Sequence, residues 1–242
     1  MMDDILAACF FPTHTTPVLA SQPNNPPPLL ARDLILTSLD EITSALSLTL
    51  NTSTPGPSSI GYKLLKWAFA VSPDHFIRLF NACLSLSYHP WHTACVLPIS
   101  KPSWPDYSLP KVYRPITLLE CCGKWLEKVV ASCVLSDVNM FHLLPMNQFG
   151  SQSEHCAVDA TLALLHTVQQ GVHSGCSVST FLFDIQGFFD HIRQDRVVHL
   201  FRLLGFPSQM CDWLMSFLLD RTVVLSFNDF TGEAQSISDR SP

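Results

Sequence analysis

The sequence is poor in charge, and its apolar residues are not gathered into long runs. Only 14% of the 242 residues are Asp, Glu, Lys or Arg, whereas 47% are apolar. A chain of this length and composition can bury one large core or two modest ones, so we expect a globular body. Its longest apolar runs fall short of a bilayer span, so we expect no membrane partner.

Cysteine occurs nine times but never in a C-x-x-C pair. This lack of ligand spacing argues against a zinc site and, at this length, against a disulfide framework or a disulfide-linked partner. The segment Met1–Asp4 is acidic where a secretory signal would be basic. The sequence therefore indicates reduced thiols in a cytosolic or nuclear protein that is not secreted.

Negative charge outweighs positive charge in the sequence: the net charge is −6 and the pI is about 5.9. This argues against a protein whose whole surface binds nucleic acid. A local basic patch is still allowed, so the places of the few Lys and Arg residues matter more than their sum.

The patterns that are present predict an α+β fold. Residues 1–34 form a Pro-rich, disordered lead-in, and Ser38 and Glu41 then form a capping box that opens a helix. Further helices are expected at residues 60–71, from 73 onward, and at 122–135, 157–170, 195–204 and 208–220. Strands are expected at residues 94–100, 112–119, 178–183 and 222–227.

Two of these strands, with the loop between them, predict a hairpin that carries Lys101, Lys111 and Arg114. The five tryptophans are scattered rather than arranged in a stripe, so we interpret all of them as packing anchors rather than a base-stacking platform. They are Trp67, Trp91, Trp104, Trp125 and Trp213.

The most informative stretch is the apolar run that ends at Asp184. We interpret Val178–Phe183 as a buried strand that delivers a carboxylate to the edge of the core. Burying a carboxylate is unfavourable unless a positive group pairs with it, and a divalent cation is a common partner. The alternative is that Asp184 caps a neighbouring turn. For Asp190, a helix cap is favoured over a catalytic role.

Taken together, the chain resembles the reverse transcriptase domain of non-LTR (LINE-like) retrotransposons, most closely the fungal elements. The resemblance covers residues 35–242 and rests on several stretches in the family's order, of which any one alone is weak. They are Thr54–Ile60 with Tyr62–Trp67, Val96–Pro102, Tyr113–Leu119 with Lys124 and Leu126–Lys128, Gln148–Gly150 with Asp159, and Phe183–Asp190.

The resemblance implies part of a right-hand polymerase, with fingers at about residues 35–175 and a partial palm at about 176–242. Two Mg²⁺ ions support nucleotidyl transfer in such enzymes. By its place in the family's motif A, Asp184 would bind both ions, and the Ile185 carbonyl would help to hold the second. Phe189 would be the steric gate against ribonucleotides. Lys101 and Arg114 would clamp the triphosphate.

The implied partners are an RNA template, a DNA primer and deoxynucleoside triphosphates, and the family's life cycle implies a nuclear or cytoplasmic location. The chain departs from the family at two points. No aromatic-x-Asp-Asp follows Asp190, since the one Asp-Asp pair is Asp3-Asp4. At the family's G-x-P-Q-G-S-P motif the chain reads Ser236–Pro242, with Arg240 where the family has glycine.

These departures leave three hypotheses open. The chain is a fragment of an RNA-directed DNA polymerase that keeps part of the nucleotide site, although we expect no activity and at most weak Mg²⁺ binding from it alone. Alternatively, it binds RNA or nucleotides without turnover. In the third hypothesis it is a non-functional remnant of a retrotransposon.

Overall fold

The computed structural model describes residues 29–145, 147–152, 155–185, 192–227 and 230–237. The chain divides into two units, residues 1–130 with 188–242 and residues 131–187. The described α-helices are α2 (Leu39–Ser47), α3 (Tyr62–Val71), α4 (Pro73–Ser85), α5 (Cys121–Met140), α6 (Ala157–His173), α7 (Gln194–Leu203) and α8 (Ser208–Leu218), with a short 3₁₀ turn η1 (Pro110–Val112). The strands are β1 (Thr93–Ser100), β2 (Tyr113–Leu118), β3 (Thr222–Phe227) and β4 (Phe230–Ser236).

The four strands form one mixed sheet in the first unit, in the order β2-β1-β3-β4. The β1–β2 and β3–β4 pairs are antiparallel, whereas β1 and β3 run parallel. One face of the sheet packs around Ala94, Val96, Val223 and Leu225, all of them buried. The expected α+β class is thus confirmed. Among the described residues, no helix is apolar enough over enough length to cross a membrane.

Local sequence signals account for the start of α2 and the end of α7. Ser38 Oγ accepts a hydrogen bond from the Glu41 amide, and Glu41 Oε2 accepts one from the Ser38 amide at 2.7 Å, which is the predicted capping box. Gly205 follows α7 with φ +72°, and a side chain there would meet the Leu30 carbonyl oxygen at 2.5 Å. The helix predicted at residues 195–204 therefore ends as expected, just before Gly205.

Residues at the end of the expected lead-in pack onto the same turn. The Leu29 and Arg32 amides donate to the carbonyl oxygens of Leu203 and Gly205 at 2.8 and 3.0 Å. The Arg32 guanidinium lies 4.7 Å from the centre of the Phe206 ring. This short segment is therefore attached to the turn between α7 and α8.

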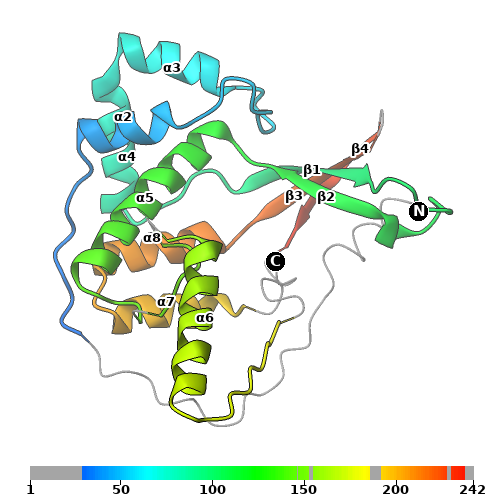
Figure 1. Ribbon diagram of the computed structural model, residues 1–242. Helices are drawn as coiled ribbons and strands as arrows, with labels where there is room; N and C mark the ends of the chain where they lie inside the picture. Colours follow the sequence, from blue (N-terminus) through cyan, green and yellow to red (C-terminus); the bar gives the residue numbers. More distant parts are fainter. Residues whose placement is uncertain (1–28, 146, 153–154, 186–191, 228–229, 238–242) are drawn as a thin grey trace. The chain divides into compact units, whose positions relative to one another are not determined.

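An aromatic cluster in the first unit joins α2, α3, α4 and the start of α5 (Figure 1). The Trp125 side chain is fully buried and donates its indole N–H to the Ile42 carbonyl oxygen at 2.9 Å. The rings of Phe69, Phe76 and Phe80 have centroids 5.2, 5.1 and 4.9 Å from the Trp125 ring. Because only Leu119 and Glu120 separate α5 from β2, we infer that this cluster anchors one end of the β1–β2 hairpin.

The predicted buried strand Val178–Phe183 is wrong. The residues lie in the second unit, outside any helix or strand, and Phe181, Leu182 and Phe183 are 78%, 88% and 91% exposed. An apolar run becomes a buried strand only when neighbouring strands pair with it and other elements cover its faces. Within the described part of the chain no strand does so.

Candidate active-site elements

The β1–β2 hairpin brings together the two basic residues that the sequence assigned to nucleotide binding. Arg114 in β2 pairs with Ile99 in β1, and the Lys101 amide donates to the Val112 carbonyl oxygen at 2.8 Å, just beyond the last strand pair. Side chains alternate between the faces of a strand, so Arg114 and Ile99 share a face. By the same alternation, Lys101 lies on this face of the hairpin, which is opposite the face that holds the apolar core.

The Lys101 ammonium is partly engaged by its own loop. Nζ donates to the Lys111 carbonyl oxygen at 2.6 Å and lies 5.9 Å from the centre of the Trp104 ring. The Tyr107 hydroxyl donates to the Lys101 carbonyl oxygen at 3.1 Å, which holds the loop against the hairpin. A lysine has three N–H donors. Two of them are thus left for an anion such as a phosphate.

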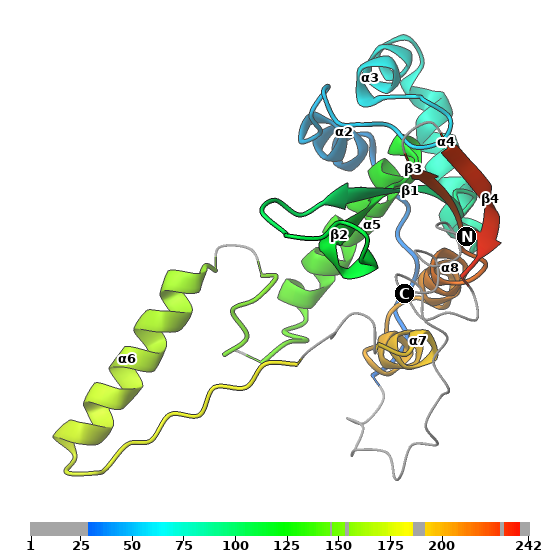
Figure 2. The same ribbon diagram turned by 90° about the vertical axis from the view of Figure 1, so that its right-hand side faces the viewer.

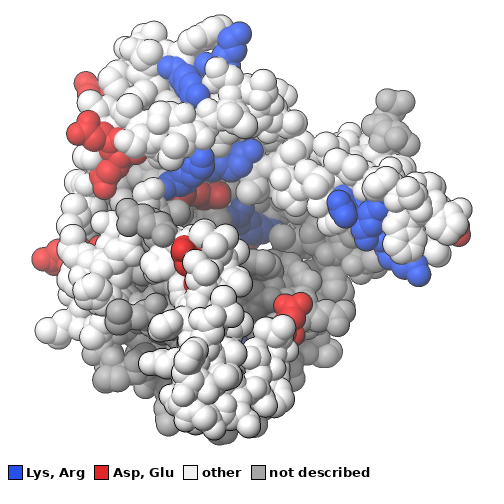
Figure 3. Space-filling model, viewed as in Figure 1, with Lys and Arg blue, Asp and Glu red and all other residues white. Residues whose placement is uncertain are grey.

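Arg114 is exposed, and no hydrogen bond or ion pair of its side chain involves the described residues. Its planar fork can therefore bind two oxygens of a phosphate without first breaking a contact. Lys101, Lys111 and Arg114 form the hairpin patch, and the Lys and Arg side chains over β1 and β2 are visible together in Figure 3. The predicted hairpin with three cations is confirmed. What these cations bind stays a prediction.

A second contact joins the Thr54–Ile60 stretch of the resemblance to Glu120, the residue that follows the Tyr113–Leu119 stretch. The Ser58 amide donates to Glu120 Oε1 at 2.8 Å, and the Ser58 hydroxyl donates to Glu120 Oε2. A side chain at Gly56 would lie 2.7 Å from the Glu120 amide nitrogen, so glycine allows the loop its close approach. Glu120 stands between β2 and α5 and was not singled out from the sequence. Its acidic character at the start of a helix was the available signal.

The expected metal ligands belong to the second unit, whereas the hairpin patch belongs to the first. Asp184 is exposed, and so is Ile185, at 64%. Phe189 and Asp190 lie outside the described residues. Within the described ranges, no three His, Cys, Asp or Glu side chains lie close enough together to hold a metal ion.

The described residues therefore do not fit a pair of Mg²⁺ ions. Magnesium takes six oxygen ligands in near-octahedral geometry, and a two-ion site needs carboxylates that converge from more than one element. Asp184 supplies one carboxylate, and the carbonyl of Ile185 supplies one further oxygen. The roles of Asp184, Ile185 and Phe189 thus remain predictions.

Comparison with known proteins gives the family context of these elements. The chain is 30% identical over 186 residues to the "Probable RNA-directed DNA polymerase from transposon BS" of Drosophila melanogaster, which covers 76% of this chain. It is 26% identical over 167 residues to the "Probable RNA-directed DNA polymerase from transposon X-element" of the same organism, over 67% of this chain. It is 23% identical over 208 residues to the "RNA-directed DNA polymerase from mobile element jockey", over 83%.

These matches cover most of this chain but little of the relatives. The chain spans 20%, 18% and 22% of their lengths. No protein-family model matches it. The expected fungal subtype is not supported, because these relatives come from a fly. The chain is nevertheless homologous to a fragment of the RNA-directed DNA polymerases, or reverse transcriptases, of non-LTR retrotransposons.

Proposed function

We propose that this chain supplies the fingers and a partial palm of a non-LTR retrotransposon reverse transcriptase. In this assignment the fingers take about residues 35–175 and the palm about 176–242. The observation that carries the proposal is the hairpin patch, where Lys101 and Arg114 share one face of a two-stranded hairpin. The compact ammonium of a lysine and the planar guanidinium of an arginine, held side by side on a hairpin, suit the phosphates of an incoming deoxynucleoside triphosphate.

The palm part of the proposal concerns Asp184, Ile185 and Phe189. Asp184 would be one carboxylate ligand of Mg²⁺, with the Ile185 carbonyl beside it, and Phe189 would select against a ribose 2′-hydroxyl. One carboxylate holds such an ion weakly, so binding by this chain alone is weak. The site of action would be the nucleus or the cytoplasm.

Removing both cations of the expected clamp tests the hairpin patch. We expect Lys101→Ala with Arg114→Ala to weaken dGTP binding by the 242-residue chain at least about tenfold, because charge-assisted hydrogen bonds to phosphate are lost. Isothermal titration calorimetry at two salt concentrations measures the change. Both residues lie on an exposed or half-buried part of the hairpin, so the circular dichroism spectrum should stay unchanged.

The matched control removes two cations elsewhere in the same unit. Lys63 on α3 and Arg78 on α4 are both exposed, so Lys63→Ala with Arg78→Ala changes the net charge equally. This control should leave dGTP binding within about twofold of the unmodified chain, because distant exposed charges are screened by salt. Equal losses in the two double variants, or dGTP binding that survives loss of the patch, would contradict the assignment.

The chain alone is expected to make no DNA. One carboxylate from Asp184 cannot hold two ions, so primer extension on an RNA template should stay at the level of a blank with Mg²⁺ or Mn²⁺. Templated incorporation above the blank would overturn this expectation. If dGTP or RNA binds without incorporation, the chain acts as a non-catalytic binding module, which is the second candidate function. If neither binds, the remnant hypothesis is favoured.

A further inference from the structure

A pocket of about 340 Å³ opens between the sheet and the helices of the first unit. Its wall is mostly apolar and comes from β1, β2, β3, α7, α8 and the residue after β4, with Ala94, Val223, Leu218 and Ile237 among the contributors. Sites for small molecules are commonly of this size, apolar, and supplied with few polar groups. None of the residues discussed for nucleotide or metal binding lines it.

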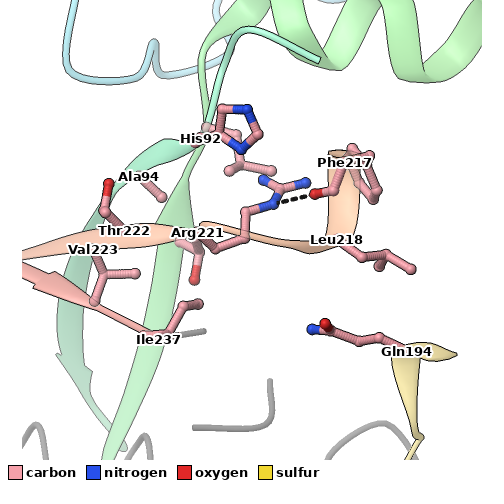
Figure 4. Close-up of a pocket in the computed structure, with 11 residues that line it drawn as sticks. His92, Ala94, Gln194, Phe217, Leu218, Arg221, Thr222, Val223 and Ile237 are labelled. Carbon is pink, nitrogen blue, oxygen red and sulfur yellow. Dashed lines mark hydrogen bonds between the residues drawn. The ribbon is translucent and has the colours of Figure 1, made fainter. Parts of the chain in front are cut away.

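The main charge in the pocket is Arg221, between α8 and β3. Its Nε donates to the Phe217 carbonyl oxygen at 2.6 Å, and its guanidinium carbon lies 4.1 Å from the centre of the Phe217 ring. Figure 4 shows the guanidinium between His92 and Phe217, with the Gln194 side chain extending toward the middle of the group from α7. Among the described residues, the two terminal nitrogens of Arg221 have no hydrogen-bond partner.

This cation is only partly compensated by the protein. Burial lowers the pKa of Arg221, and the carboxylate of Glu127 opposes that shift without forming an ion pair. Burial also raises the pKa of Glu127, with Arg221 acting against it. For both groups, desolvation therefore outweighs their mutual attraction. A second anion close to Arg221 would be stabilised in such surroundings.

Some of the other polar groups in the pocket already make hydrogen bonds within the protein, and others do not. His92 Nδ1 lies 3.1 Å from the Leu219 carbonyl oxygen, and Thr222 Oγ1 lies 2.9 Å from the hydroxyl of Thr93. Within the described part of the chain, the Gln194 amide and the Thr117 hydroxyl make no hydrogen bond. Two uncharged donors thus face the same apolar space as the guanidinium.

We propose that this pocket binds a small monocarboxylate with an apolar body, whose carboxylate pairs with Arg221 while its body lies against Val223, Leu218 and Ile237. A carboxylate matches the two terminal N–H groups of a guanidinium in a bidentate pair. The apolar wall favours an aryl or alkyl body over a sugar or a polyphosphate, which would leave polar groups unpaired against it. The site is separate from the hairpin patch, and it does not depend on the proposed polymerase function.

The test uses 2-naphthoate and its neutral analogue 2-naphthamide with the full chain. We expect the acid to bind at least about tenfold more tightly than the amide, as measured by isothermal titration calorimetry, because only the acid pairs with the cation. Equal affinities of the two compounds, or the lack of any binding up to the solubility limit of the acid, would overturn the proposal.

A second test adds a negative charge to the pocket wall by a substitution that should not disturb folding. Gln194 is the first residue of α7, where an acidic side chain favours the helix, so Gln194→Glu should fold normally. Its carboxylate should weaken 2-naphthoate binding about tenfold and leave 2-naphthamide unchanged. Gln209→Glu makes the same change in the first turn of α8, outside the pocket, and should alter neither affinity. If both variants weaken the acid alike, the assignment of this pocket fails.

Discussion

Replacing Phe181 and Phe183 with aspartate is expected to convert the chain from a self-associating species into a monomer. The unmodified segment Val178–Phe183 carries no charge and no proline, and Phe181 and Phe183 are 78% and 91% exposed. Outside Cys176, no backbone hydrogen bond from residues 176–185 is formed within the described part of the chain. Figure 2 shows this stretch as an extended trace after α6.

Such a segment has the properties of a strand that pairs with another copy of itself. Its backbone amides and carbonyls form no backbone hydrogen bonds with the described residues. Its residues favour β structure, and two copies can pair without charge repulsion. Aspartate at positions 181 and 183 would place two negative charges on one face of that strand and repel the second copy. Sedimentation velocity over a range of micromolar concentrations measures the change, with an expected shift of at least about tenfold in the association midpoint.

A matched variant separates the segment from exposed apolar surface in general. Val71 and Leu86 are 85% and 77% exposed in the first unit, so Val71→Asp with Leu86→Asp adds the same charge and removes two apolar side chains. This variant should keep self-associating. A monodisperse unmodified chain, or equal relief by both variants, would show that Val178–Phe183 does not mediate association.

The same segment shows why one part of the fold could not be predicted from the sequence. Local patterns predicted the capping box at Ser38, the end of α7 at Gly205 and the β1–β2 hairpin, because each depends on residues close together in the chain. The residues of Val178–Phe183 are likewise typical of a buried strand, yet the structure does not place them in one. Whether such a strand is buried depends on partners from elsewhere in the chain, which a short window of sequence does not contain.

The candidate sites divide in the same way. Lys101 and Arg114 could be paired from the sequence because a single hairpin holds them, and Glu120 gave a weak signal at a helix start. Arg221 gave none. Its pocket draws residues from His92 to Ile237, and only the packing of α7 and α8 against the sheet brings these together. Cavities lined by distant segments follow from tertiary packing rather than from spacing.

The tryptophans show that residues of one type, given one and the same prediction, can differ widely in burial. All five were interpreted as packing anchors, yet Trp125 is fully buried and Trp67 is 60% exposed. The exposed ring of Trp67 has the ammonium of Lys63 5.0 Å from its centre, whereas the buried ring contacts three phenylalanines. The interpretation therefore holds for Trp125 and fails for Trp67.

Trp125→Ala is expected to destabilise the first unit by about 3–5 kcal/mol, because it leaves a cavity among four helices. It also leaves the Ile42 carbonyl oxygen without the indole donor at 2.9 Å. Trp67→Ala removes the same side chain from an exposed position and should change stability by at most about 1 kcal/mol, the range of an exposed cation–π contact. Urea unfolding followed by far-UV circular dichroism measures both changes.

The loss of stability should extend beyond the helices, since only Leu119 and Glu120 separate β2 from α5 and the buried ring holds the start of α5 in place. Trp125→Ala should therefore also weaken dGTP binding at the hairpin patch, even in urea-free buffer where the chain is still folded. Trp67→Ala should leave that binding unchanged. Similar unfolding midpoints for the two variants would show that the aromatic cluster does not hold this unit together. A stability loss confined to Trp125→Ala, with full dGTP affinity, would separate the cluster from the hairpin that it is inferred to anchor.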